Sequence, residues 1–145
     1  MGNAFFIRAV AGVFLASMLG LTSAPAWAQA VSYKIVLRAG NEIPPAGSQG
    51  SGTAELVYNP TTLTLSWTVT YAGLTGPVTA GHIHGAAPVG ANAGIQIPFA
   101  TLASPIKGEA ILTNGQAADL LSGRMYVNLH TAANPGGELR GQIAQ

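Results

Sequence analysis

Apolar and polar residues alternate with a period of two along much of the chain after residue 30. The clearest case is 63–71, where Leu, Trp, Val and Tyr fall on one side of an extended backbone and Thr and Ser on the other. The segment 124–130 alternates in the same way, and its polar side, with Tyr126, Asn128 and His130, is expected to face outward. This alternation is typical of strands with one buried face.

The same pattern predicts eight short strands separated by Gly, Pro and Asn. They are expected at 31–37, 53–58, 63–71, 78–84, 94–99, 107–112, 124–130 and 139–144. The adjacent Pro44 and Pro45 exclude a central strand between the first two. One short helix is expected over 114–121, with Asn114 as its N-cap and Gly123 just after its end. The chain is therefore predicted to be all-β, a β-sandwich or Greek-key barrel of about eight strands with one short helix.

Residues 1–28 have a different pattern, that of a secretory signal peptide. Arg8 precedes an uncharged apolar run at 9–21, and small residues surround a cleavage site of the A-x-A type ending at Ala28. Cleavage is expected after Ala28, with Ala30 as the alternative. A membrane anchor is the competing interpretation, but the run has about 13 residues whereas a span needs about 20. We therefore expect export to the periplasm or the extracellular space, with no membrane span after cleavage.

Residues 29–145 would form one mature domain of low charge. This part of the chain has five basic and five acidic residues, so its net charge is zero when histidine is neutral. Such a domain lacks the basic stripe on which nucleic-acid binding depends, and has no attraction for an anionic membrane surface. The chain has no cysteine, so disulfides, thiolate zinc sites and thiol nucleophiles are excluded. Burial, a metal or a partner must stabilise the fold.

The polar residues that could carry chemistry concentrate on two or three strands. Alternate residues of a strand share a face, so His82 and His84 point to one side while Ile83 points to the core. His130 is the only other histidine. If the strands meet, a single polar face would contain His82, His84, Tyr126, Asn128, His130, Glu138 and Arg140.

Two interpretations of this polar face remain open. In the first, His82, His84 and His130 bind one copper or zinc ion, for which imidazole is a suitable ligand, and leave a position open. In the second, the histidines form hydrogen bonds that order the Gly-rich loop after His84, and Arg140 and Glu138 join that network. A third hypothesis is a pH-responsive interface, since clustered imidazoles gain charge between about pH 5 and 7.

Other chemistries find no support in the chain. There is no evident pair of carboxylates for glycosidase chemistry, no G-x-S-x-G motif and no phosphate-binding loop. Without a complete catalytic constellation, the domain is expected to be non-enzymatic, a binding or structural domain with an unknown protein or small ligand as its partner. A mononuclear copper- or zinc-binding protein is the alternative.

Several motifs, in order along nearly the whole mature chain, resemble one known family. They are NEIPP at 41–45, YAGLTGPV at 71–78, GHIHG at 81–85, YVNLHT at 126–131 and NPGGELRGQI at 134–143. The chain resembles the CHRD domain, named after chordin, which also occurs in many bacterial exported proteins. The resemblance implies an immunoglobulin-like β-barrel with limited similarity to copper/zinc superoxide dismutases.

The GHIHG segment at 81–85 is similar to the strand that carries copper ligands in those dismutases. They need six histidines, an aspartate and a disulfide, whereas this chain has three histidines and no cysteine. A bimetallic site cannot be built, so dismutase activity is not expected. The antagonist role of chordin depends on further modules and is not implied for this chain.

Overall fold

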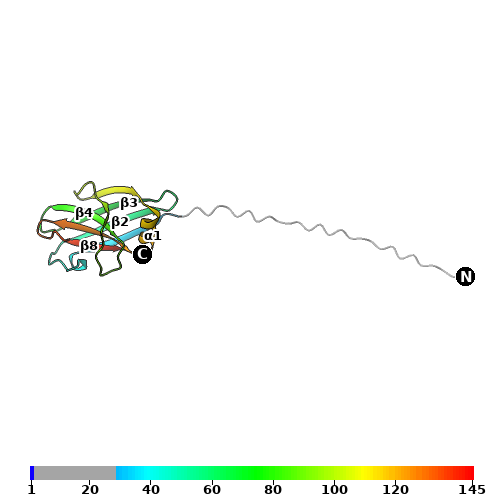
Figure 1. Cartoon of the computed structure of the whole chain (residues 1–145). Coiled ribbons are helices and arrows are strands. Elements are labelled where there is room, and N and C mark those ends of the chain that lie inside the picture. The colour runs from blue at the N-terminus through cyan, green and yellow to red at the C-terminus, as the bar shows by residue number, and fades with distance from the viewer. Residues whose placement is uncertain (2–28) are drawn as a thin grey trace.

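The computed structural model describes residues 29–145 together with Met1 (Figure 1). Apart from Met1, the expected signal peptide, with its cleavage site at Ala28, lies outside the described residues. The strands are β1 (Val31–Arg38), β2 (Ser51–Asn59), β3 (Thr64–Ala72), β4 (Val78–Gly85), β5 (Ile95–Pro98), β6 (Ile106–Ile111), β7 (Met125–Thr131) and β8 (Leu139–Ile143). A 3-10 turn, η1 (Ala39–Asn41), and one helix, α1 (Asn114–Leu121), complete the elements. Neither helical element of the described chain has the length and apolar character that a membrane crossing requires.

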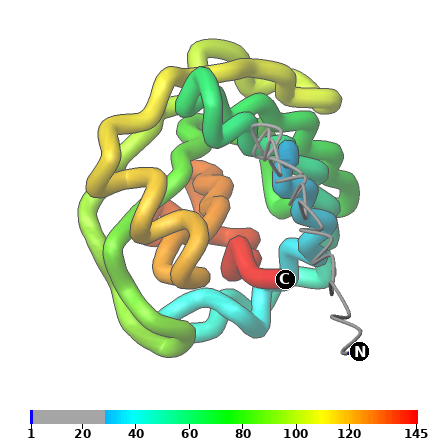
Figure 2. The backbone as a smooth tube through the Cα atoms, turned by 90° about the vertical axis from the view of Figure 1, so that its right-hand side faces the viewer, coloured from blue at the N-terminus to red at the C-terminus, as the bar shows by residue number. Residues whose placement is uncertain are grey.

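The strands form one sheet in the order β5-β4-β7-β8-β1-β2-β3-β6, and every neighbouring pair is antiparallel. The chain crosses from β3 to β4 and returns from β5 to β6 at the opposite end of that order. The sheet curls into a nearly closed, barrel-like form, and the backbone encircles the core (Figure 2). Between β1 and β8 the ladder has the single pair Arg38 and Arg140. The predicted all-β class with eight strands and one helix is confirmed.

The core follows from the alternation seen in the sequence. On β3, Leu65, Trp67 and Val69 are buried, and the intervening Thr and Ser side chains are not. Side chains of the other half of the sheet, such as Ile83 of β4, meet them in one continuous apolar cluster. Trp67 and Phe99 pack with their ring centroids 5.3 Å apart. Each such buried side chain contributes about 1.5–3 kcal/mol through the removal of apolar surface from water.

The helix has the expected bounds but a different N-cap. Thr113 caps it: its hydroxyl accepts a hydrogen bond from the Gln116 N–H at 3.2 Å. The Gln116 side chain in turn accepts the Thr113 N–H at 2.9 Å, which completes a capping box. The prediction of Asn114 as the N-cap is wrong. Gln116 can form a capping box only with the residue three positions before it, and that residue is Thr113. Gly123, with φ of 69°, follows the end of the helix.

Most of the outward face of β7 is covered, although His130 at its end is only half-buried. Tyr126 and Asn128 lie on this face as expected, yet they are only 3% and 2% exposed. Two loops cover them: the Ala93 backbone of the 86–94 loop contacts the Tyr126 hydroxyl, and Glu42, after η1, contacts Asn128. These residues therefore point outward from the core, as predicted, but they are covered, because the loops pack a second, polar layer onto the sheet.

Candidate metal centre

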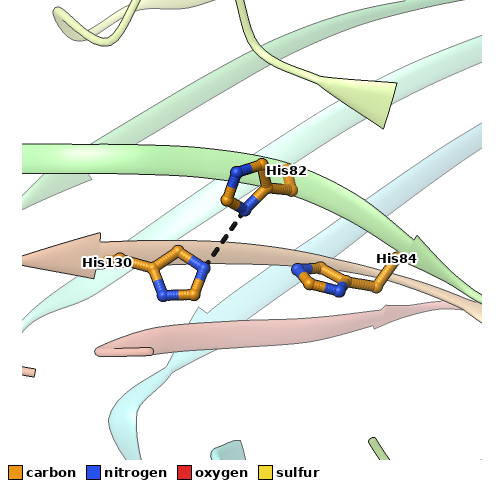
Figure 3. A group of neighbouring side chains, drawn as sticks. All are labelled: His82, His84 and His130. Atoms are coloured by element: carbon orange, nitrogen blue, oxygen red, sulfur yellow. Dashed lines mark hydrogen bonds between the residues drawn. The ribbon is translucent and has the colours of Figure 1, made fainter. Parts of the chain in front are cut away.

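The three histidines come together on the outer face of β4 and β7. The two strands are adjacent, and their register sets His82 opposite Asn128, His84 opposite Tyr126 and Ala80 opposite His130. The ring nitrogens that could serve as ligands all lie within 4.8 Å of one another. In Figure 3 the rings of His82 and His130 point toward each other, and the ring of His84 points at the same space. The meeting of these imidazoles, distant in the chain, is thus as the sequence led us to expect.

Backbone carbonyls fix the tautomers of two of these rings. His84 Nδ1 lies 2.9 Å from the Ala93 carbonyl oxygen, and His130 Nδ1 lies 3.0 Å from that of Pro135. A carbonyl oxygen can only accept, so each Nδ1 carries the proton and each neutral ring has its lone pair on Nε2. This is the arrangement of metal-binding histidines, whose remaining N–H is commonly held by a carbonyl or carboxylate.

The lone pairs of the three rings differ in their partners. His130 Nε2 lies 3.2 Å from His82 Nδ1, within hydrogen-bonding distance. His84 Nε2 is buried from solvent and has no hydrogen-bond partner. An unpaired acceptor at a buried position is costly, about 1–3 kcal/mol. The fold therefore keeps a free imidazole lone pair beside two other imidazoles.

The spacing is close to that of a shared ion. An ion about 2.0–2.1 Å from each nitrogen, in tetrahedral geometry, sets the nitrogens about 3.3 Å apart. The 3.2 Å between His82 and His130 already meets this condition. The other nitrogen pairs lie within 4.8 Å, so they would shorten by up to about 1.5 Å on binding.

Burial also keeps the rings in the form that binds metal. It lowers the pKa of His82, and the nearby His130 and His84 lower it further. Burial lowers the pKa of His84 as well, although the hydrogen bond to Ala93 partly opposes this effect. Because only the neutral imidazole is a ligand, a lowered pKa favours metal binding at neutral pH.

Tyr126 and Arg140 were both expected on this face; Tyr126 stacks on His84, and Arg140 lies over the Tyr126 ring. The His84 and Tyr126 rings stack in parallel, with centroids 4.8 Å apart and an angle of 4°. The Arg140 guanidinium carbon lies 3.5 Å from the centroid of the Tyr126 ring. These contacts are close enough for stacking and cation–π attraction. The Tyr126 ring is thus in contact with both the His84 imidazole and the Arg140 guanidinium.

Asn128 lies in the same layer but bonds to Glu42, a residue that the sequence patterns did not indicate. The Asn128 side-chain amide donates to the Glu42 carboxyl, which is only 5% exposed. Burial raises the pKa of Glu42 to about 7, although Arg140 and the Asn128 hydrogen bond act in the opposite direction. Gly137, with φ of 135°, leaves the space for this pair, since a Cβ there would lie 2.5 Å from the Asn128 amide nitrogen. In the sequence, the only indication that Glu42 has a role was its position as an isolated acidic residue inside the NEIPP motif.

Glu138, which was expected among the histidines, makes its bonds elsewhere. It is fully buried, and its carboxylate accepts hydrogen bonds from the side chains of Ser48, Thr75, Thr131 and Asn134 and from the Thr75 backbone N–H. The pKa of Glu138 is lowered to about 2 because these hydrogen bonds outweigh the opposing effect of burial. Glu138 therefore joins three loops rather than completing the histidine cluster.

The raised pKa of Glu42 leads to a pH-dependent prediction. We expect Glu42→Gln to become more stabilising, relative to the unmodified protein, as the pH rises from about 5 to 8. The folded-state pKa of about 7 exceeds the ordinary value of 4.5, so the contribution of the protonated carboxyl is complete below pH 4.5 and is lost as the pH rises through 7. Glutamine stays neutral throughout.

Urea unfolding of both proteins at about pH 4.5, 6 and 8 measures this difference. The lowered pKa values of His82 and His84 affect both proteins alike, so the comparison isolates residue 42. A difference in unfolding free energy that stays constant with pH would contradict the prediction.

The fold and the site together define a small all-β domain with a buried polar layer and a triad of histidines on one face of its sheet. The chain belongs to the CHRD domain family, whose family model matches residues 33–143. No curated protein and no solved structure matched the chain.

Proposed function

We propose that this chain is a non-enzymatic binding domain that holds a single copper or zinc ion. The ligands are His84 and His130 through Nε2 and His82 through Nδ1. In the metal-free protein His82 Nδ1 donates to His130 Nε2, so metal binding moves the His82 proton to its own Nε2. The observation that carries the proposal is the buried Nε2 of His84, a lone pair without a hydrogen-bond partner beside two other imidazoles.

The alternative, a hydrogen-bonded network without metal, explains only part of the geometry. It accounts for the Nδ1 contacts of His84 and His130 with backbone carbonyls, and for the contact between His82 and His130. It leaves His84 Nε2 unpaired in a buried position, at a cost that a bound ion would remove. A metal therefore gives every ring nitrogen that faces the cluster a partner.

The ligand chemistry supports copper or zinc in particular. Three neutral imidazoles with no carboxylate or thiolate suit these ions rather than magnesium or calcium, which prefer oxygen. His82 and His130 are only half-buried, so an ion has a path to the site from solvent. Among the residues that the structure describes, no second group of three histidines or carboxylates gathers in this way. A two-metal dismutase centre therefore forms no part of the proposal.

The signal-peptide pattern of residues 1–28 supports placing this domain in the periplasm or outside the cell. A single ion bound there suits storage, transfer or the capture of a further ligand at the open coordination position.

Metal titration of the purified full-length protein tests the proposal. Protein prepared without chelator is expected to bind about one equivalent of copper or zinc, measured by elemental analysis and by calorimetric titration. Ligand present at about 100 times its dissociation constant would stabilise the fold by about 2.7 kcal/mol, which a thermal melt detects.

Magnesium is the matched control, and no shift in melting temperature is expected with it. Absence of copper and zinc at high purity, together with no thermal shift on adding either ion, would remove the proposed function.

A further inference from the structure

We propose that Tyr126 and Arg140 are positioning residues, which act through residues 91–93 to hold His84 in the tautomer that presents Nε2 to the metal. This inference rests on the proposed function for its purpose. The positioning itself concerns the metal-free protein, so it can be tested separately.

A backbone carbonyl of the 86–94 loop fixes the ring of His84. His84 Nδ1 donates to the Ala93 carbonyl oxygen, which belongs to the 86–94 loop between β4 and β5. A loop carbonyl fixes a ring only if the loop itself is fixed. Residues around this carbonyl are partly or fully exposed to solvent, so the sheet beneath must supply the restraint.

Tyr126 supplies the first restraint. Its hydroxyl oxygen accepts the Ala93 N–H at 3.1 Å, and the same hydroxyl lies 3.3 Å from the Ala93 carbonyl oxygen, to which it donates. One phenol thus holds both polar groups of the residue that fixes His84. Its ring also stacks on the His84 imidazole, so the tyrosine fixes the position of the ring and of its acceptor.

Arg140 supplies the second restraint. Its two terminal nitrogens donate to the Asn92 side-chain oxygen at 2.8 Å and to the Ala91 carbonyl oxygen at 2.6 Å. The side chain is 2% exposed, and within the described part of the chain it has no carboxylate partner within 4.0 Å. A buried guanidinium is costly unless its donors are used, and here they are used on the loop. The Arg140 guanidinium carbon also lies 3.5 Å from the centroid of the Tyr126 ring, so the two restraining side chains contact each other.

Loss of either restraint would free the tautomer of His84. A neutral imidazole places its proton on either nitrogen, and the hydrogen-bond partner decides which. If the Ala93 carbonyl moves away, the proton can occupy Nε2, and that form cannot bind a metal through Nε2. Outer contacts of this kind typically change metal affinity 10–100-fold.

The experiment compares Tyr126→Phe with Tyr71→Phe. Both substitutions remove one tyrosine hydroxyl from a strand, but the Tyr71 hydroxyl of β3 donates to the Leu102 carbonyl in the connection between β5 and β6. Nitrogen-15 NMR of the histidine rings in the metal-free protein reports the tautomer of His84, and competition titration reports copper and zinc affinity. Circular dichroism confirms that each variant is folded.

The expected result is a single Nδ1-protonated tautomer of His84 in the unmodified protein and in Tyr71→Phe. Tyr126→Phe is expected to show a mixture of tautomers and at least about 10-fold weaker metal binding. Arg140→Lys, which keeps the charge but loses the planar fork, is expected to do the same.

Tyr126→Phe and Arg140→Lys that retain both the single tautomer and the full affinity would overturn the inference. The two proposals fail in distinguishable ways. If the unmodified protein binds no metal, the proposed function fails, while the NMR spectra of the metal-free variants still decide whether Tyr126 and Arg140 set the tautomer.

Discussion

Glu138→Gln is expected to lower the free energy of unfolding by about 2–4 kcal/mol. The Glu138 carboxylate is fully buried and accepts five hydrogen bonds. Hydroxyl donors can rotate and the Asn134 amide can turn over, but the Thr75 N–H, which faces one carboxylate oxygen, is fixed by the backbone. A glutamine would have to place its oxygen at the Thr75 N–H, and its N–H groups would then face the hydroxyls of Thr75 and Thr131 and the Asn134 amide, whose present hydrogen bonds would be lost.

The loss would extend beyond the hydrogen bonds themselves. Ser48 comes from the loop before β2, Thr75 from the connection between β3 and β4, and Asn134 from the connection between β7 and β8. Glu138 fixes all three connections at one point. We therefore expect local loosening of these loops in addition to the lower unfolding free energy, visible as faster amide hydrogen exchange there.

Urea unfolding measures this effect, with Glu55→Gln as the matched control. Glu55 pairs with Lys34 at 2.9 Å, but both side chains are mostly exposed, so its substitution is expected to cost less than about 1 kcal/mol. Equal losses in the two variants would contradict the role of Glu138. Because the folded-state pKa is lowered to about 2, the contribution of Glu138 is present above the ordinary value of 4.5 and is lost as the pH falls toward 2.

His84→Ala is expected to weaken copper and zinc binding about 100-fold or more. A four-ligand zinc site contributes about 10–16 kcal/mol, so the loss of one ligand removes roughly 3 kcal/mol. Among the three proposed ligands, His84 is the one whose Nε2 has no hydrogen-bond partner in the structure. Calorimetric titration of the variant and the unmodified protein, at neutral pH, measures the change.

Glu109→Gln is the control for this experiment. Glu109 is an exposed carboxylate on β6, away from β4 and β7, and its loss removes only adventitious binding at the surface. Metal affinity is expected to stay unchanged in this variant. Full affinity in His84→Ala would show that the ion lies outside the three-histidine cluster.

The strands and their faces were predictable from the sequence because they depend on local patterns. The alternation in 63–71 placed Leu65, Trp67 and Val69 in the core, where the structure has them. The spacing of His82 and His84 set both on one face of β4, with Ile83 on the other. Both conclusions follow from the period of two in a strand, which needs no knowledge of the rest of the chain.

The composition of the buried polar layer depended on contacts that no local pattern encodes. Asn128 and Glu42 are 86 residues apart, and Ser48 and Glu138 are 90 apart. Their pairing requires loops to fold back over the sheet. A period-two pattern gives only the side of the sheet on which a residue lies, so it could not show that Tyr126 and Asn128 would be covered.

By itself, the sequence determined the all-β class, the strand positions, the family resemblance and the shared face of His82 and His84. Only the tertiary structure decided that His130 lies within ligand distance of this pair, that Glu138 bonds to other loops, and that backbone carbonyls fix the ring tautomers. The physical reason is that strand faces follow from backbone geometry one residue at a time. A polar site depends instead on hydrogen bonds between distant segments, whose positions are set when the sheet closes and its loops pack.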